Sequence, residues 1–283
     1  MRTITTIAEL QHQIRAARGR SERIGFVPVH DAVYDGDVER IRTARAQCGF
    51  VVVSVIRRTQ QSAGVFSRFQ TQLELPSRQA ALAAAGGADL LWLPAAADID
   101  PASAIASVQI SASDTTRRIG SAEDVNRLTT QIVRLLGCIA PDVMYLDDVD
   151  LERSVLIERT VQDLQMPVQV RRVPALRHPD GCAMSGACAA LADDQRRVAS
   201  LLPQALMQAA EAVRAGTITS VGRLRAHVEM LLIDATGIDV EYVELIDPST
   251  LEPAETLTGS GCLVASVRLD GVRVVDNVPI DVQ

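Results

Sequence analysis

The stretch IGFVPVHDAVYDGDV, residues 24–38, leads from an apolar strand directly into a helix. Its first six residues, 24–29, are apolar apart from the breaks at glycine and proline, and a helix is expected over residues 36–48. A second apolar run, GFVVVSVI at residues 49–56, lacks the period-2 alternation of a half-exposed strand. Such runs are typical of parallel strands that are covered on both faces. The segment therefore predicts a strand–helix–strand unit of a parallel sheet.

The same alternation continues to about residue 177. Further strands are expected to start at Ala88, Asp142 and Pro167, and further helices to cover residues 77–85, 122–138 and 150–164. Ser121 followed by Asp124 approximates a capping box at the start of one helix. Strands separated by crossover helices predict a doubly wound, Rossmann-like parallel sheet, whose ligands bind beyond the carboxyl ends of the strands.

From residue 178 the pattern becomes that of a smaller α+β domain. Helices are expected over residues 191–215 and 220–236, with Pro203 producing a kink in the first. Antiparallel strands are expected from Val240, Gly261 and Val272, and Asp270-Gly271 is a typical hairpin turn. The predicted domains are residues 1–177 and residues 178–283.

Composition excludes several classes of function. The net charge of -7 and the pI near 5.2 argue against a nucleic-acid surface, which needs clustered basic residues. A membrane role is not predicted, because no apolar run reaches about 18 residues and the first residues lack the order of a signal peptide. The five scattered cysteines make a poor disulfide framework, so reduced and mostly buried thiols are expected. These features predict a cytoplasmic protein.

Lysine is absent from the sequence, and all 28 basic positions are arginine. A lysine therefore cannot serve as Schiff base, general base or phosphate clamp in this chain.

Five segments carry a resemblance to a known family: TITTIAELQ from Thr3, PDVMYL from Pro141, DLQMPVQVRRVP from Asp163, EYVELIDPSTLEP from Glu241 and VVDNV from Val274. Together they resemble pantothenate synthetase, the pantoate-beta-alanine ligase of the nucleotidylyltransferase superfamily, over nearly the whole chain. The resemblance implies a Rossmann-like amino domain that binds ATP and a carboxylic acid, a smaller domain that closes over it, and a homodimer. It also implies ATP and Mg²⁺, formation of an acyl adenylate, and attack of an amine to give an amide.

The turn after the first strand departs from this family. The family has a P-T-M-G-A-L-H-x-G-H-like turn, and its two histidines stabilise the phosphates. The corresponding stretch here is residues 28–37, with Tyr34 and Asp37 at the two histidine positions. The resemblance therefore implies a site from which both phosphate-binding histidines are missing.

Other ligand segments are altered as well. The family's G-E-K-D-x-Q-Q segment, whose lysine touches phosphate and whose glutamine holds pantoate, corresponds to residues 147–153, where Val149 replaces the lysine and only Asp150 is kept. Its S-S-R-N segment keeps its first serine as Ser185 and loses the phosphate arginine. Its N-P-x-Q-F segment keeps the acid-binding glutamine as Gln60. The scaffold segments are thus retained while most ligand positions differ.

These replacements change the charge expected in the pocket. Asp31, Asp35, Asp147 and Asp148 lie near the altered positions. At about 4 to 6 Å and an effective dielectric constant of about 20, each carboxylate facing a phosphate costs roughly 3 to 4 kcal/mol. The pattern predicts a pocket that accepts positive charge, either a divalent ion or a protonated amine. The alternative is a polar loop that drifted after selection for ATP binding lapsed.

Candidate site residues follow from this hypothesis. The predicted acid-base groups are His30, Tyr34, Asp35 and Asp37. The predicted substrate-binding residues are Arg57, Arg58, Gln60, Asp147, Asp148, Asp150, Arg153 and Ser185. Alternatives stay open for three groups: a helix cap for Asp150, a surface ion pair for Arg153, and a solvated acidic loop for Asp147 and Asp148. No metal site is assigned, because neither the spacing nor the ligand mix is diagnostic.

Three functions are consistent with the sequence. The first is a pantothenate synthetase-like enzyme of specialised metabolism that acts on a small amine, amino acid or carboxylic acid without the usual ATP site. The second is an ATP-dependent acid-amine ligase such as pantoate-beta-alanine ligase, with Mg²⁺ bridging the acids to phosphate. The third is a non-catalytic binding or partner subunit.

Overall fold

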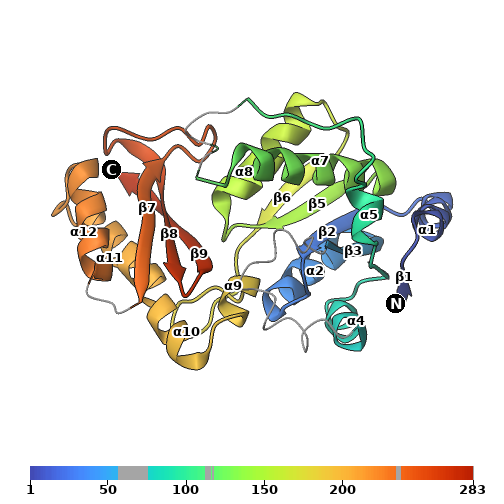
Figure 1. The fold of residues 1–283 in the computed structure, drawn as a ribbon, viewed down its shortest axis with the longest axis horizontal. Helices are drawn as coiled ribbons and strands as arrows, with labels where there is room; N and C mark the ends of the chain where they lie inside the picture. Colours follow the sequence, from blue (N-terminus) through green and yellow to red (C-terminus); the bar gives the residue numbers. More distant parts are fainter. Residues whose placement is uncertain (57–75, 112–115, 117, 234–236, 283) are drawn as a thin grey trace. The chain divides into compact units, whose positions relative to one another are not determined.

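The computed structural model describes residues 1–56, 76–111, 116, 118–233 and 237–282, and the chain divides into two compact units (Figure 1). The first unit comprises Met1–Asp148 and Leu156–Pro174, and the second comprises Val149–Val155 and Ala175–Gln283. A short segment at the start of one helix thus belongs to the second unit. The division into domains at residues 177 and 178 remains a proposal.

Among the described residues, the first unit contains a parallel sheet of six strands in the order β1-β4-β3-β2-β5-β6. The strands are β1 (Arg2–Ile4), β2 (Ile24–His30), β3 (Phe50–Ile56), β4 (Leu90–Trp92), β5 (Val143–Asp147) and β6 (Gln169–Val173). This order confirms the predicted doubly wound sheet of the nucleotidylyltransferase type. The apolar runs at residues 24–29 and 49–56 form β2 and β3, which are neighbours.

Helices cover both faces of this sheet. They are α1 (Ile7–Gly19), α2 (Asp35–Gln47), α4 (Pro76–Ala85), α5 (Ala96–Ile99), α7 (Ala122–Ile139) and α8 (Leu151–Asp163). Val27 and Val29 pack in one core cluster with Ile41 and Ala44 of α2. Phe26 is also fully buried, and its side chain points to the opposite face because side chains alternate along a strand. Burial on both faces explains why these strands lack an alternating pattern.

The second unit contains a three-stranded antiparallel sheet in the order β7-β8-β9. Its elements are α9 (Gly186–Ala189), α10 (Asp193–Ala199), α11 (Leu201–Arg214), α12 (Val221–Ile233), β7 (Ile238–Ile246), β8 (Gly259–Leu269) and β9 (Val272–Val282). The expected hairpin turn joins β8 to β9, with φ of 46° at Asp270 and 83° at Gly271. Positive φ at both central residues is the geometry that an Asp-Gly pair favours. The predicted smaller α+β part is confirmed.

The prediction of one helix over residues 191–215 is wrong in one respect. It is divided at Ser200 into α10 and α11, and Pro203 lies in the first turn of α11 rather than at a kink within a longer helix. Proline is tolerated there because the first amide groups of a helix have no partner within the helix. The break therefore falls before the proline, where the chain begins a new helix.

Candidate active site

The carboxyl edge of the six-stranded sheet brings together residues from two segments of the first unit. β2 lies where the strand order reverses, between β3 and β5. His30 ends β2 and Asp147 ends β5, so both lie at the carboxyl ends of neighbouring strands. Ligands of doubly wound sheets bind at such a switch point. The architecture therefore places these two predicted residues at the edge where a ligand is expected.

A tight turn connects β2 to α2. Asp31 is buried with φ of 64°, and its amide donates to the carbonyl of Ile56 at 2.9 Å. Aspartate adopts this left-handed conformation more readily than most residues. The amide of Val33 donates to the side-chain oxygen of the buried Gln79. The turn is thus fixed by β3 and α4, and it places Tyr34 at the start of α2.

Asp37 interacts with the first turn of α2. Its carboxylate accepts a hydrogen bond from the backbone amide of Tyr34 at 2.8 Å and forms an ion pair with Arg40. Such a side chain satisfies an amide that the helix itself leaves without a partner. Burial raises the pKa of the Asp37 carboxyl, although Arg40 acts in the opposite direction. Asp35, by contrast, is exposed at the start of the helix.

Arg40 is a functional candidate that the sequence analysis missed. Its side chain is 7% exposed and lies between two carboxylates, contacting Asp37 through Nη2 and Asp147 through Nη1, the latter at 3.2 Å. Burial opposes its charge, but Asp37 and Asp147 raise the pKa of Arg40 above its usual value. The sequence feature that could have indicated its burial is helical spacing, because Arg40 lies four residues before the buried Ala44 and next to the buried Ile41. The cluster of Asp37, Arg40 and Asp147 carries a formal charge of about -1 at neutral pH.

Asp37 and Asp147 do not fit the Mg²⁺ site that the resemblance implies. Each gives a carboxylate oxygen to Arg40, so an ion between them would lie against a guanidinium and be repelled. Within the described ranges, no three side chains among histidine, cysteine, aspartate and glutamate are grouped as a metal site. The charge partner of these carboxylates is arginine.

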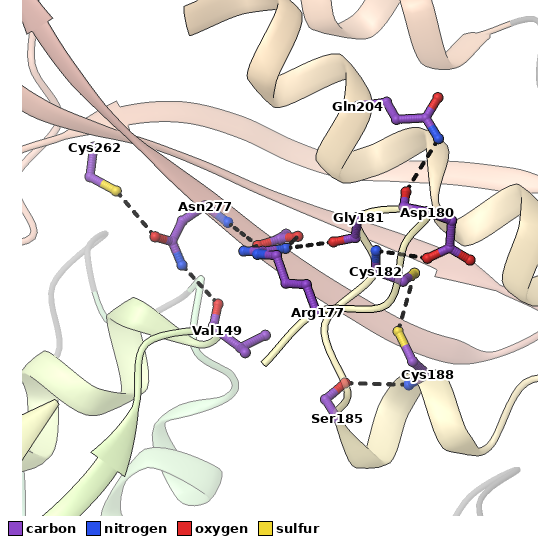
Figure 2. Close-up of polar contacts among 11 residues, drawn as sticks. Val149, Arg177, Asp180, Gly181, Cys182, Ser185, Cys188, Gln204, Cys262 and Asn277 are labelled. Carbon is purple, nitrogen blue, oxygen red and sulfur yellow. Dashed lines mark hydrogen bonds and ion pairs between the residues drawn. The ribbon is translucent and has the colours of Figure 1, made fainter. Parts of the chain in front are cut away.

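The predicted residues from 148 to 153 are divided between the two units, with Asp148 in the first and Asp150 and Arg153 in the second. Asp150 accepts a hydrogen bond from the Arg153 amide at 3.1 Å, and its carboxylate lies 3.5 Å from Nε of Arg153. This is the arrangement of a capping residue at the start of α8. The carbonyl of Val149 accepts a hydrogen bond from Nδ2 of Asn277 at 2.9 Å (Figure 2).

Glu152 is a buried carboxylate near the start of α8 that the sequence analysis did not identify. It is 4% exposed, and the hydroxyl of Tyr242 donates to its carboxylate. Arg273 donates from Nη2 to the same hydroxyl at 3.3 Å and lies 5.8 Å from the centre of the tyrosine ring. Burial and the negative charge of Glu152 raise the pKa of Tyr242. The buried carboxylate is thus satisfied within the second unit.

Ser185 begins the short helix α9 in the second unit. Its hydroxyl accepts a hydrogen bond from the amide of Cys188 at 3.4 Å, and the Cys188 sulfur lies 3.4 Å from that of Cys182 (Figure 2). Arg57, Arg58 and Gln60 lie outside the described residues. The structure brings Asp37 close to Asp147 through their shared contact with Arg40. The roles of all predicted site residues remain proposals.

The parallel sheet with its switch point between β2 and β5 defines an α/β protein of the nucleotidylyltransferase type. Comparison with known proteins identifies the family within this class. The model of the family described as pantoate-beta-alanine ligase matches residues 2–279, and the chain belongs to this family.

Similar sequences and structures span nearly the full chain. Pantothenate synthetase of Heliobacterium modesticaldum is 31% identical, with 100% of each chain covered. A bifunctional pantoate ligase/cytidylate kinase of Synechococcus sp. is 35% identical over 97% of this chain, which spans 53% of that relative. The crystal structure of pantothenate synthetase from Thermus thermophilus matches with a TM-score of 0.85 and 26% identity, covering 98% of this chain and 99% of the other.

In the part of the chain that the structure describes, every helix is too short or too polar to cross a lipid bilayer.

Proposed function

We propose that this member of the pantoate-beta-alanine ligase family acts on a small amine, amino acid or carboxylic acid without the family's usual ATP site. The observation that supports this proposal is the pair of carboxylates, Asp37 and Asp147, that share one buried arginine at the switch point. One guanidinium against two carboxylates leaves an excess of negative charge, which repels a triphosphate and attracts an ammonium group. The absence of lysine from the sequence acts in the same direction.

The proposed roles follow from exposure and charge. The side chain of Asp147 is 43% exposed, so it can meet an ammonium group, and Asp148 follows it in the sequence. His30, Tyr34 and Asp35 are the proposed acid-base groups after β2. Asp37 is engaged by Arg40 and by the start of α2, so its proposed contribution is to position Arg40.

The remaining roles rest on residue type and on the resemblance. Arg57, Arg58 and Arg153 would hold a substrate carboxylate bidentately beside Gln60. Asp150 and Ser185 occupy positions that the family motifs keep, and they would bind other substrate groups. A homodimer and a cytoplasmic location are proposed from the family resemblance and the composition.

A second candidate function is the ATP-dependent acid-amine ligase reaction of pantoate-beta-alanine ligase. Two observations favour it: the family match over residues 2–279 and the buried cation that Arg40 supplies at the switch point. In this case Arg40 would take over part of the charge that the missing histidines and lysine supply in the family.

A panel of ligands separates these functions. The purified chain is tested by thermal shift with short amines and amino acids, with carboxylic acids, and with ATP plus Mg²⁺, and pyrophosphate release is measured when acids and amines are supplied with ATP. Stabilisation by an amine or amino acid without nucleotide is expected. Pyrophosphate release that depends on both an acid and an amine would overturn the first proposal in favour of the ligase. Binding of none of these ligands, with a protein partner retained on purification, would favour a non-catalytic subunit.

A further inference from the structure

Two buried cysteines of the second unit lie with their sulfur atoms in contact. Cys182 is 1% exposed and Cys188 is 4% exposed, and their Sγ atoms are 3.4 Å apart (Figure 2). Both are free thiols in the structure, as the scattered cysteine pattern predicted. A disulfide requires an S–S distance of about 2.05 Å. The two sulfurs are therefore less than about 1.5 Å from bonding distance.

The backbone on both sides of the pair is held by hydrogen bonds. The amide of Cys182 donates to the Asp180 carboxylate at 3.0 Å, and its carbonyl accepts from the His178 amide at 2.8 Å. The carbonyl of Gly181 accepts from Arg177 at 2.9 Å. The amide of Cys188 is bound by Ser185 on the other side. These contacts keep the thiols facing one another in the reduced protein.

The other buried cysteines have different surroundings. Cys48 lies 3.4 Å from the hydroxyl of Tyr145, and Cys262 lies 3.5 Å from the side-chain oxygen of Asn277. These sulfur atoms thus face oxygen atoms. This difference makes Cys182 and Cys188 the pair whose geometry suits a covalent link.

We propose that Cys182 and Cys188 form a reversible dithiol–disulfide pair that is oxidised by a peroxide. The Cys188 thiolate attacks one oxygen of hydrogen peroxide and becomes a sulfenic acid, while the other oxygen leaves as hydroxide and is protonated to water. The Cys182 sulfur then attacks the Cys188 sulfur and expels a second hydroxide, which is also protonated to water. The sum is two thiols and one peroxide giving one disulfide and two water molecules, and the two thiols lose two electrons.

The assignment of Cys188 as the first nucleophile follows from its surroundings. The hydrogen bond with Cys182 lowers the pKa of Cys188, although burial opposes this effect. The same hydrogen bond and burial raise the pKa of Cys182. Cys188 is therefore the thiol that ionises more readily, and it is also the more exposed of the two, at 4% against 1%.

The disulfide would close a short loop that contains Ser185. Its amide contact with Cys188 lies inside this loop, so oxidation would reduce the conformational freedom of the segment in the unfolded chain. The expected consequence is a rise in the melting temperature of the second unit on the order of 5 °C, reversed by a thiol reductant.

Mass spectrometry of the full chain tests the proposal. After treatment with hydrogen peroxide, we expect a mass lower by about 2 Da, three reactive thiols instead of the five in the reduced chain, and one cross-linked peptide joining residues 182 and 188. Dithiothreitol should restore the starting mass. Cys182→Ser and Cys188→Ser should abolish the loss of mass, whereas the matched control Cys262→Ser should retain it.

Three results would overturn the proposal. One is a gain of about 16 or 32 Da on single cysteines without a cross-link. Another is a disulfide that links other cysteines. The third is a pair that stays reduced at equilibrium in a strongly oxidising glutathione buffer. The measurements on the unsubstituted chain decide the matter even if one of the two serine variants fails to fold.

Discussion

Two clusters of arginine and aspartate in this protein differ in how their charges are matched. In the second unit, Arg177 binds both oxygens of Asp276 at 2.7 Å, and the side chains of Asp276 and Arg177 are 4% and 35% exposed. In the first unit, Arg40 is shared between Asp37 and Asp147, and the side chain of Asp147 is 43% exposed. The Arg177–Asp276 pair matches one charge with one charge in a bidentate geometry, which suits a structural role. The Arg40 cluster leaves negative charge at the switch point, where a ligand is expected.

Among the substitutions considered, removal of Arg177 from its pair with Asp276 is expected to lower the stability most. Arg177→Met should lower the free energy of unfolding of the second unit by about 3 to 5 kcal/mol, because it leaves a buried carboxylate without its cation. Urea denaturation measures this loss. A loss of unfolding free energy below about 1 kcal/mol would contradict a structural role for this pair.

A smaller loss is expected at the shared arginine. Arg40→Met should cost about 2 to 3 kcal/mol, because the more exposed Asp147 can be hydrated when its partner is removed. Adding Asp37→Asn should recover part of the loss, since it removes the more buried carboxylate, and the double-mutant cycle measures the coupling. Additive losses would show that the two side chains do not interact.

The pH dependence of the Arg40→Met loss has a definite sign. Burial raises the folded-state pKa of Asp37 above its unfolded value, so protonation of this carboxyl favours the folded state. The loss should therefore shrink as the pH falls through the folded-state pKa toward about 4. Denaturation at several pH values tests this, and a loss that grows on acidification would contradict it.

A half-exposed pair in the first unit provides an intermediate reference. Arg18 and Asp142 lie 2.7 Å apart, and their side chains are 42% and 33% exposed. Burial opposes ionisation, but the amide of Ile24 and the Arg18 guanidinium hold the pKa of Asp142 below its usual value. The folded-state pKa is thus below the unfolded value, so the stabilisation is present above about pH 4 and is lost as the pH falls through the folded pKa.

Asp142→Asn should accordingly cost no more than about 1 kcal/mol at pH 7, after allowance for solvent screening. The variant and the unsubstituted chain should converge in stability once the pH falls below the folded-state pKa of Asp142. A constant difference at every pH would show that the carboxylate charge is not the source of the stabilisation.

The smallest effect is expected at an exposed pair. Arg42 and Glu39 of α2 lie 3.3 Å apart, with side chains 59% and 45% exposed. Arg42→Met should change the free energy of unfolding by less than about 0.5 kcal/mol. It is the matched control for Arg40→Met, because both arginines belong to the same helix. If Arg42→Met lowered the free energy of unfolding as much as Arg40→Met, both losses would arise from a weaker α2 and not from the lost contacts with Asp37 and Asp147.

Much of the fold was predictable because buried parallel strands have a strong sequence signal. The runs that form β2 and β3 are continuous and apolar, and the Asp270-Gly271 turn has a composition typical of a hairpin. The first strand was missed because β1 has only three residues. The helix after it could have been found, since Thr6 and Glu9 form a capping box.

The site was less predictable than the fold. Sequence analysis placed His30 and Asp147 at the ends of strands, which depends only on where the apolar runs stop. Arg40 was missed because an arginine within a helix is usually exposed, although its spacing from the buried Ala44 assigns it to the packed face of α2. The acid-base role of Asp37 remains a prediction, and its carboxylate contacts the start of α2 and Arg40.

Isothermal titration of the unsubstituted chain and of Asp147→Asn most directly tests whether the switch point accepts positive charge. We expect that a short amine or amino acid binds the unsubstituted chain, that Asp147→Asn weakens this binding about tenfold or more, and that ATP with Mg²⁺ gives no binding heat. Binding of ATP with Mg²⁺ to the unsubstituted chain, strengthened by Asp147→Asn, would contradict this expectation.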